Sequence, residues 1–67
     1  MSKLHSSRHI TSILKKHGFT EVSKKGSHAK YKNDDGVTVI VPHPKSEIPI
    51  GTFSSILKQS GLSKEDF

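Results

Sequence analysis

The sequence predicts an α+β fold with the order α-β-β-β-α, in which two helices cover one face of a three-stranded antiparallel sheet. Apolar residues recur with i, i+3, i+4 spacing near both ends of the chain, as on one face of a helix. Between them lie three short strand-like runs separated by turns that contain glycine. Because 67 residues provide only one hydrophobic core, we expect a single domain over residues 1–67.

The first helix is expected over about Ser6–His17. A serine at its start can accept hydrogen bonds from the free N–H groups of the first turn. Gly18 suits the left-handed residue that ends many helices, and Phe19 can then close back onto the helix. The stripe of this helix that faces the core is expected to consist of Ile10, Ile13 and Leu14.

Three strands are expected next, and the second helix follows them. The strands are expected over about Phe19–Lys24, Ser27–Lys32 and Val37–Val41. Pro42 and Pro44 end the third strand, because proline cannot donate to a sheet ladder. The second helix is expected over about Gly51–Ser60, with Gly61 at its end and one further turn over residues 63–66. Its stripe is expected to consist of Phe53, Ile56 and Leu57.

Side-chain alternation predicts which residues lie on the open face of the sheet. In the second strand, Ala29 and Tyr31 are expected to face the helices. The outward side chains of this strand are then His28, Lys30 and Lys32. In the third strand, the three valines face the core and Thr38 and Ile40 point outward. An outward Ile40 suits a contact with a protein.

The charge of the chain favours a polyanionic partner. Eleven Lys and Arg residues oppose six Asp and Glu residues, which gives a net charge of +5 and a pI near 9.8. Nucleic acid is the first expectation, followed by an anionic membrane surface or an acidic protein. The plainer alternative is that the charge only keeps a small protein in solution.

Cations and a glycine turn surround the outward face of the second strand, which suits phosphate groups. Lysine attracts the phosphate backbone without reading the base sequence, and glycine lets a phosphate approach the main chain. The residues expected to bind RNA are Lys24, Lys25, Gly26, Ser27, Lys30 and Lys32.

His28 is the candidate catalytic residue. RNA carries its own nucleophile, the 2′-OH, so cleavage requires a proton acceptor, a proton donor and positive charge near the phosphate. Imidazole suits proton transfer near neutral pH, and this route needs neither a metal ion nor a cofactor. An exposed strand histidine is more often an ordinary surface residue, and only the surrounding cations support catalysis. No second acid or base is evident.

The other histidines have plainer interpretations. His5 and His9 are four residues apart and could form two ligands of a metal site, but no third ligand is evident. His17 is expected at the C-terminal end of the first helix, where a positive charge is favourable. His43 is either a loop residue, which we favour, or a second functional group.

The compartment is expected to be the cytoplasm. The sequence contains no cysteine, whereas a small secreted domain is usually held by disulfides. The N-terminal residues show no apolar run of the kind found in signal peptides or membrane spans. We therefore expect no membrane partner.

Five segments together resemble the HicA family of toxin ribonucleases. They are residues 13–19 (ILKKHGF), 25–28 (KGSH), 39–43 (VIVPH), 48–52 (IPIGT) and 56–62 (ILKQSGL). The resemblance implies a fold like the double-stranded-RNA-binding domain, metal-independent cleavage of mRNA, and a cognate HicB-type antitoxin that blocks the active face. The family's catalytic histidine lies in a Gly-Ser-His motif, which His28 matches. Ile50 departs from the basic residue of many relatives.

Two alternatives to a ribonuclease remain open at this point. A non-catalytic RNA-binding module would bind RNA with a steep salt dependence and leave it intact. A pure interaction protein would use its basic face to meet an acidic partner. The first alternative fits the expected fold and charge, although Lys58 is the only cation expected in the second helix.

Overall fold

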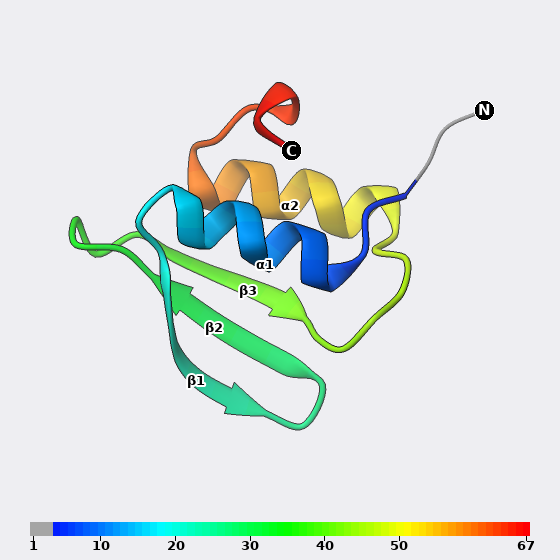
Figure 1. Ribbon diagram of the computed structural model, residues 1–67, viewed down its shortest axis with the longest axis horizontal. Helices are drawn as coiled ribbons and strands as arrows, with labels where there is room; N and C mark the ends of the chain where they lie inside the picture. The colour runs from blue at the N-terminus through cyan, green and yellow to red at the C-terminus, as the bar shows by residue number, and fades with distance from the viewer. Residues whose placement is uncertain (1–3) are drawn as a thin grey trace.

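The computed structural model describes residues 4–67 and confirms the predicted order of elements (Figure 1). The bounds differ from the expected ones by no more than one residue. The elements are α1 (Ser7–Lys16), β1 (Thr20–Lys25), β2 (His28–Lys32), β3 (Thr38–Pro42), α2 (Ile50–Ser60) and a short 3-10 helix, η1 (Lys64–Asp66). None of the helices within residues 4–67 is both long enough and apolar enough to cross a membrane.

Both ends of α1 are closed as the sequence predicts. The Ser6 hydroxyl accepts a hydrogen bond from the His9 N–H at 3.1 Å. At the other end, Gly18 has a φ of 90° and the Phe19 N–H donates to the Leu14 carbonyl at 3.0 Å. Because the Leu14 and Phe19 side chains are both buried, this Schellman closure joins the helix end to the core.

The buried stripe of α1 differs from the expected one. Ile10 and Leu14 are fully buried, but Ile13 is only half-buried. Ser7 and Thr11 complete the buried face instead. The four positions have the i, i+3, i+4, i+7 spacing of one helical face, which places Ile13 at its margin. Apolar residues alone therefore indicated the correct helix but a slightly rotated face.

The sheet is antiparallel with the strand order β1-β2-β3. Lys30 of β2 lies opposite Ile40 of β3, and Ala29 lies opposite Val41. Between β1 and β2 the register shifts at Val22, which forms a β-bulge. Residues opposite each other share a face of the sheet, so this register assigns every side chain to the helix side or to the open side.

The hydrophobic core lies between the helices and the inner face of β2 and β3. Of the residues expected to face inward, Ala29, Tyr31, Val39 and Val41 are at most 2% exposed, whereas Val37, just before β3, is only partly buried. Thr38 and Ile40 point outward as predicted. The complete core consists of Ile10, Leu14, Phe19, Ala29, Tyr31, Val39, Val41, Ile48, Phe53 and Ile56. Leu57, the third residue of the α2 stripe, is only partly buried against this core.

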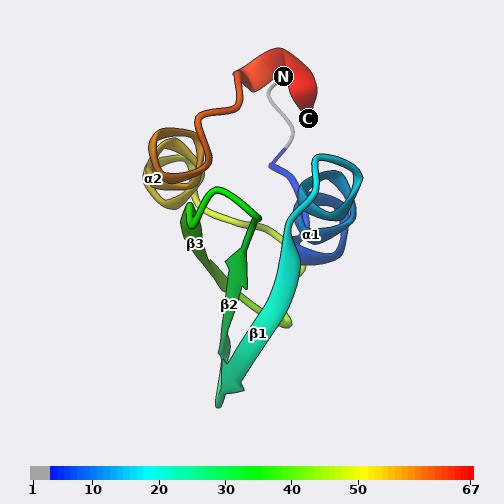
Figure 2. The ribbon, with the colours of Figure 1, turned by 90° about the vertical axis from the view of Figure 1, so that its left-hand side faces the viewer.

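The helices cover the sheet only in part. Both helices contact β3, whereas all six residues of β1 are exposed. In Figure 2 the two helices are seen nearly end-on, and the sheet extends away from them toward β1. The prediction that the two helices cover one face of the sheet is thus correct for β2 and β3, whereas β1 extends beyond the helices. A wide part of the sheet is therefore open to large ligands.

The chain after α2 folds back over both helices. Gly61 has a φ of 75° and its N–H donates to the Leu57 carbonyl at 3.0 Å. Ser63 and Asp66 then form the capping box that starts η1, which confirms the expected final turn. The Phe67 ring packs edge-on against Phe53, with ring centroids 5.3 Å apart. The C-terminal turn is thereby attached to the core.

An aromatic cluster joins this turn to the chain before α1. The His5 and His9 rings stack with centroids 4.8 Å apart, and His5 also meets Phe53 edge-on. His9 Nε2 forms a 2.6 Å hydrogen bond with the Phe67 carbonyl oxygen. Burial, and secondarily the charge of His9, lower the pKa of His5 from its ordinary value of 6.5.

We expect His5 to make the protein less stable in mild acid. Because its pKa is lower in the folded chain, the unfolded chain binds more protons just below pH 6.5. The free energy of unfolding should therefore fall as the pH drops from 6.5 to the folded pKa. Urea unfolding at about pH 7.5 and about pH 5.5 measures this loss.

The comparison requires three proteins. His5→Gln should lose less stability between the two pH values than the wild type. His17→Gln is the matched control, because His17 is exposed at the end of α1. An equal loss in the wild type and in His5→Gln would show that His5 does not cause the dependence.

Candidate functional site

A two-residue turn places His28 at the start of β2. Lys25 lies opposite His28, so Gly26 and Ser27 are the only residues of the loop. Gly26 has a φ of 55° and Ser27 has a negative φ, which is the pattern of a type II′ turn. A Cβ at Gly26 would meet nothing within 4 Å, so the turn requires glycine for its backbone conformation and not for space.

The turn is also attached to β3. The His43 N–H donates to the Ser27 carbonyl at 2.7 Å, immediately beyond the pair formed by His28 and Pro42. This bond extends the ladder between β2 and β3 by one residue. The backbone around His28 is therefore fixed on both sides, whereas its side chain is exposed.

A shallow hollow of about 220 Å³ surrounds His28 on the open face of the sheet. Lys25 lies directly opposite His28, where Cβ atoms are about 4.5–5.5 Å apart. Lys30 follows two residues later on the same face, about 6–7 Å along the strand. The hollow is lined by Ser23, Lys25, His28, Ala29, Lys30 and Ile40. It combines one imidazole, two ammonium groups and one hydroxyl.

The structure brings some of the predicted site residues together and separates others. Lys25 and Lys30 share the hollow with His28, and Gly26 and Ser27 form the adjacent turn. Lys32 lies on the same face but at the far end of β2, opposite Thr20 and Thr38.

Lys24 occupies a different place. It lies opposite the buried Ala29, so its side chain leaves the sheet on the helix side. The structure therefore does not bring Lys24 to the hollow of His28.

His43 faces α1 and not this hollow. Its Nδ1 lies 2.8 Å from the hydroxyl of the buried Ser7. The same hydroxyl donates to the Lys45 carbonyl at 3.1 Å and accepts from the Lys45 N–H at 2.9 Å. With the hydroxyl hydrogen directed to Lys45, the ring nitrogen Nδ1 is the donor to Ser7.

The remaining histidines form no metal site in the described part of the chain. His5 and His9 pack in the aromatic cluster described above, and His17 is the exposed C-cap of α1, as expected. Within residues 4–67, no three side chains of the metal-ligating types gather in one place.

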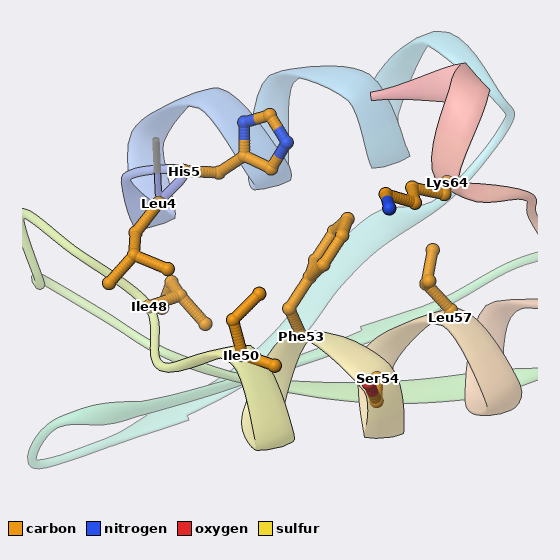
Figure 3. A pocket seen from close by; sticks show the side chains of 8 residues that line it. All are labelled: Leu4, His5, Ile48, Ile50, Phe53, Ser54, Leu57 and Lys64. Atoms are coloured by element: carbon orange, nitrogen blue, oxygen red, sulfur yellow. The ribbon is translucent and has the colours of Figure 1, made fainter. Parts of the chain in front are cut away.

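A second hollow, of about 250 Å³, is apolar and lies away from His28 (Figure 3). Phe53 and Leu57 of α2 form one side, and Leu4 and His5 before α1 form the other. Ile50 of α2 also lines it and is 60% exposed. Among the described residues that line this second hollow, only His5, Ser54 and Lys64 carry polar side-chain groups, so the hollow is a weaker candidate for acid–base chemistry than that of His28.

A comparison with protein families identifies the family of the chain. The model of the HicA toxin of bacterial toxin–antitoxin systems matches residues 7–62, which include every helix and strand except η1. The chain belongs to the HicA toxin family. No individually curated protein matches it significantly. Membership in the HicA family implies that the protein is the toxin of a toxin–antitoxin pair and has an antitoxin as its partner.

Two features near this candidate site were not predicted from the sequence. Ser23 adds a hydroxyl to the hollow, and its position depends on the bulge at Val22, which has no sequence signal of its own. The hydrogen bond between His43 and Ser7 joins residues 36 positions apart. Such a contact depends on the path of the loop after β3, and the spacing of residues in the sequence does not predict that path.

Proposed function

We propose that this HicA toxin is an endoribonuclease that cleaves mRNA in the hollow around His28. The observation that carries the proposal is the position of His28, exposed between Lys25 and Lys30 on the open face of the sheet. An extended RNA strand can reach a shallow open face, whereas a small substrate would need an enclosed pocket. We also propose that residues 1–67 act as one domain, in the cytoplasm.

The reaction follows from the groups present. The neutral His28 imidazole accepts the proton of the 2′-OH while the 2′-oxygen attacks the adjacent phosphorus. A phosphorus–oxygen bond forms, and the bond from phosphorus to the 5′-oxygen breaks. The leaving 5′-oxygen takes a proton from water or from the His28 imidazolium. The products are a 2′,3′-cyclic phosphate and a 5′-hydroxyl, and no metal ion or cofactor enters the balance.

The lysines supply the positive charge that this step needs. Negative charge accumulates on the phosphate oxygens in the transition state, and ammonium groups aimed at them stabilise it. Lys25 and Lys30 are placed for this role in the hollow. Gly26 and Ser27 offer main-chain and hydroxyl contacts beside it, and Lys32 can hold the strand further along the sheet.

We propose that an antitoxin of the HicB type inhibits this toxin by covering the hollow. Ile40 of β3 lies opposite Lys30, lines the hollow and is 37% exposed, which offers an apolar anchor beside the cations. An acidic surface with one apolar side chain would complement it. Covering the hollow would exclude RNA without any change in the toxin.

One observation favours a non-catalytic RNA-binding module instead. Among the described residues that line the hollow, His28 is the only imidazole and there is no carboxylate. A second acid or base is therefore missing unless His28 or water performs both proton transfers. The pure interaction protein is less favoured, because Lys25 and Lys30 flank an imidazole suited to proton transfer.

The nature of the nucleophile tests the proposal. We expect the purified protein to cleave a labelled mRNA in the presence of EDTA. The same strand with a 2′-deoxy substitution at the cleaved position should bind but remain intact at that position. Cleavage of the deoxy strand at the same bond would contradict the mechanism. Binding of both strands with no cleavage of either would favour the RNA-binding module.

A further inference from the structure

A polar groove runs along α1 on the side of the molecule opposite the hollow of His28. It encloses about 610 Å³ between α1, the inner face of β1 and β2, and the loop after β3. Three cations line it: Arg8 and Lys15 on α1, and Lys45 in the loop. All three are exposed, so their charged groups are available to a ligand.

The two cations of α1 form a row. Arg8 and Lys15 are seven residues apart, which brings them to the same face of the helix. Their separation along the helix axis is about 10.5 Å. A nucleic-acid strand passes more than one phosphate over that length. The row therefore suits a chain of phosphates better than a single small anion.

The wall of the groove opposite α1 contains little that would repel an anion. Among the described residues that line it, Glu21 is the only carboxylate. Its Oε1 accepts a hydrogen bond from the Tyr31 hydroxyl at 3.3 Å. His43 presents its ring here, with Nδ1 bonded to Ser7. Its other nitrogen, Nε2, is not involved in that bond; because Nδ1 carries the proton of a neutral ring, Nε2 donates to a phosphate only when the ring is protonated.

We propose that this groove binds the phosphate backbone of the RNA substrate, as a second contact separate from the cleavage hollow. The inference rests on the proposed ribonuclease function for the identity of the ligand. The groove and the hollow lie on opposite faces of the sheet and share no lining residue, but they are linked at one end of it: the N–H of His43, which lines the groove, donates to the carbonyl of Ser27, which precedes His28. A strand leaving the hollow at the Gly26–Ser27 turn enters the groove beside His43.

The composition of the groove favours RNA over a protein segment. Protein contacts usually need an apolar centre, and the apolar hollow of Figure 3 has one in Phe53 and Leu57. The groove along α1 has cations and hydroxyl groups instead. Phosphate contacts of this kind position a strand without reading its sequence. The groove would therefore increase affinity for RNA in general.

The test measures how RNA binding depends on salt. The probe is a fluorescent, fully 2′-O-methylated RNA, which cannot be cleaved through its 2′-OH. Each phosphate contact contributes about 0.7 to the slope of log K against log salt for a single strand. The double variant R8Q/K15Q should thus lower the slope by about 1.4 and bind every RNA sequence more weakly.

The matched control removes the same charge elsewhere. K58Q/K64Q changes two exposed lysines on α2 and η1, outside the groove, and should leave the slope nearly unchanged. Equal losses in both double variants would overturn the proposal, since net charge would then explain them. Unchanged RNA binding by R8Q/K15Q, with weaker binding of the antitoxin, would also overturn it and make the groove a protein surface.

Cleavage by the wild type is measured separately on unmodified RNA. If the wild type does not cut but R8Q/K15Q still lowers the slope, the ribonuclease proposal fails while the groove remains an RNA site. If the wild type cuts and R8Q/K15Q binds RNA as the wild type does, the groove proposal fails alone.

Discussion

His28→Ala should lower the rate of RNA cleavage by about 10²–10⁴-fold, which is the usual contribution of a general acid–base group. RNA affinity should change little, because Lys25 and Lys30 remain in the hollow. Stability should also change little, because the His28 side chain is exposed and belongs to no part of the core. Single-turnover cleavage rates in EDTA, compared with affinities for 2′-O-methylated RNA, measure the two effects separately.

The matched control for this substitution is His17→Ala. His17 is also an exposed histidine, but it lies at the end of α1 and does not line the hollow. The His17→Ala variant should cut RNA at the wild-type rate. Expression of His17→Ala should arrest growth, whereas expression of His28→Ala should not. If His28→Ala cuts as fast as the wild type, His28 is not the catalytic group. If neither the wild type nor the variants cut while all bind, the protein is an RNA-binding module.

The open face of β2 was predictable because its cause is local. Alternation along five residues puts Ala29 and Tyr31 on one side and His28 on the other, whatever the rest of the fold does. The apolar pair then has to face the helices. The sequence thus predicted both the exposure of His28 and its proximity to Lys30.

The face of Lys24 was not predictable without the length of the turn. The sequence placed a turn near Gly26 but did not determine which residues pair across it, and a loop with one more residue would pair Lys24 with His28. In the structure the loop consists of Gly26 and Ser27 alone. This loop makes Lys25 the partner of His28 and sends Lys24 to the helix side. A difference of one residue in a turn exchanges the faces of the whole strand, since the side-chain period is two.

The groove along α1 shows where periodicity stops being informative. The shared face of Arg8 and Lys15 follows from their spacing on the helix. The positions of Lys45 and His43 do not, because they depend on the path of the irregular loop after β3. Ser7 determines that path by its hydrogen bonds to Lys45 and His43. The available signal was the position of Ser7, which precedes Ile10 by three residues and Leu14 by seven and so falls on the same helical face.

Ile56→Ala should cause a large loss of stability. The Ile56 side chain is fully buried in α2, which packs on β3. Truncating a buried isoleucine to alanine costs about 2–5 kcal/mol, from lost apolar burial and the cavity that remains. A chain of this length has a total stability of only about 3–10 kcal/mol. The variant should therefore lose much of its folded population, and its RNA cleavage with it.

Ile50→Ala is the matched control, since it makes the same change in the same helix at a residue that is 60% exposed. In urea titrations, its free energy of unfolding should stay within about 0.5 kcal/mol of the wild-type value, whereas that of Ile56→Ala should fall by about 2–5 kcal/mol. An antitoxin that binds only the folded toxin should raise the stability of Ile56→Ala and so offset part of the loss. The core and the hollow of His28 share β2 and β3, so a loss of the core should also disturb the hollow. If Ile56→Ala were as stable as Ile50→Ala, Ile56 would not belong to the core.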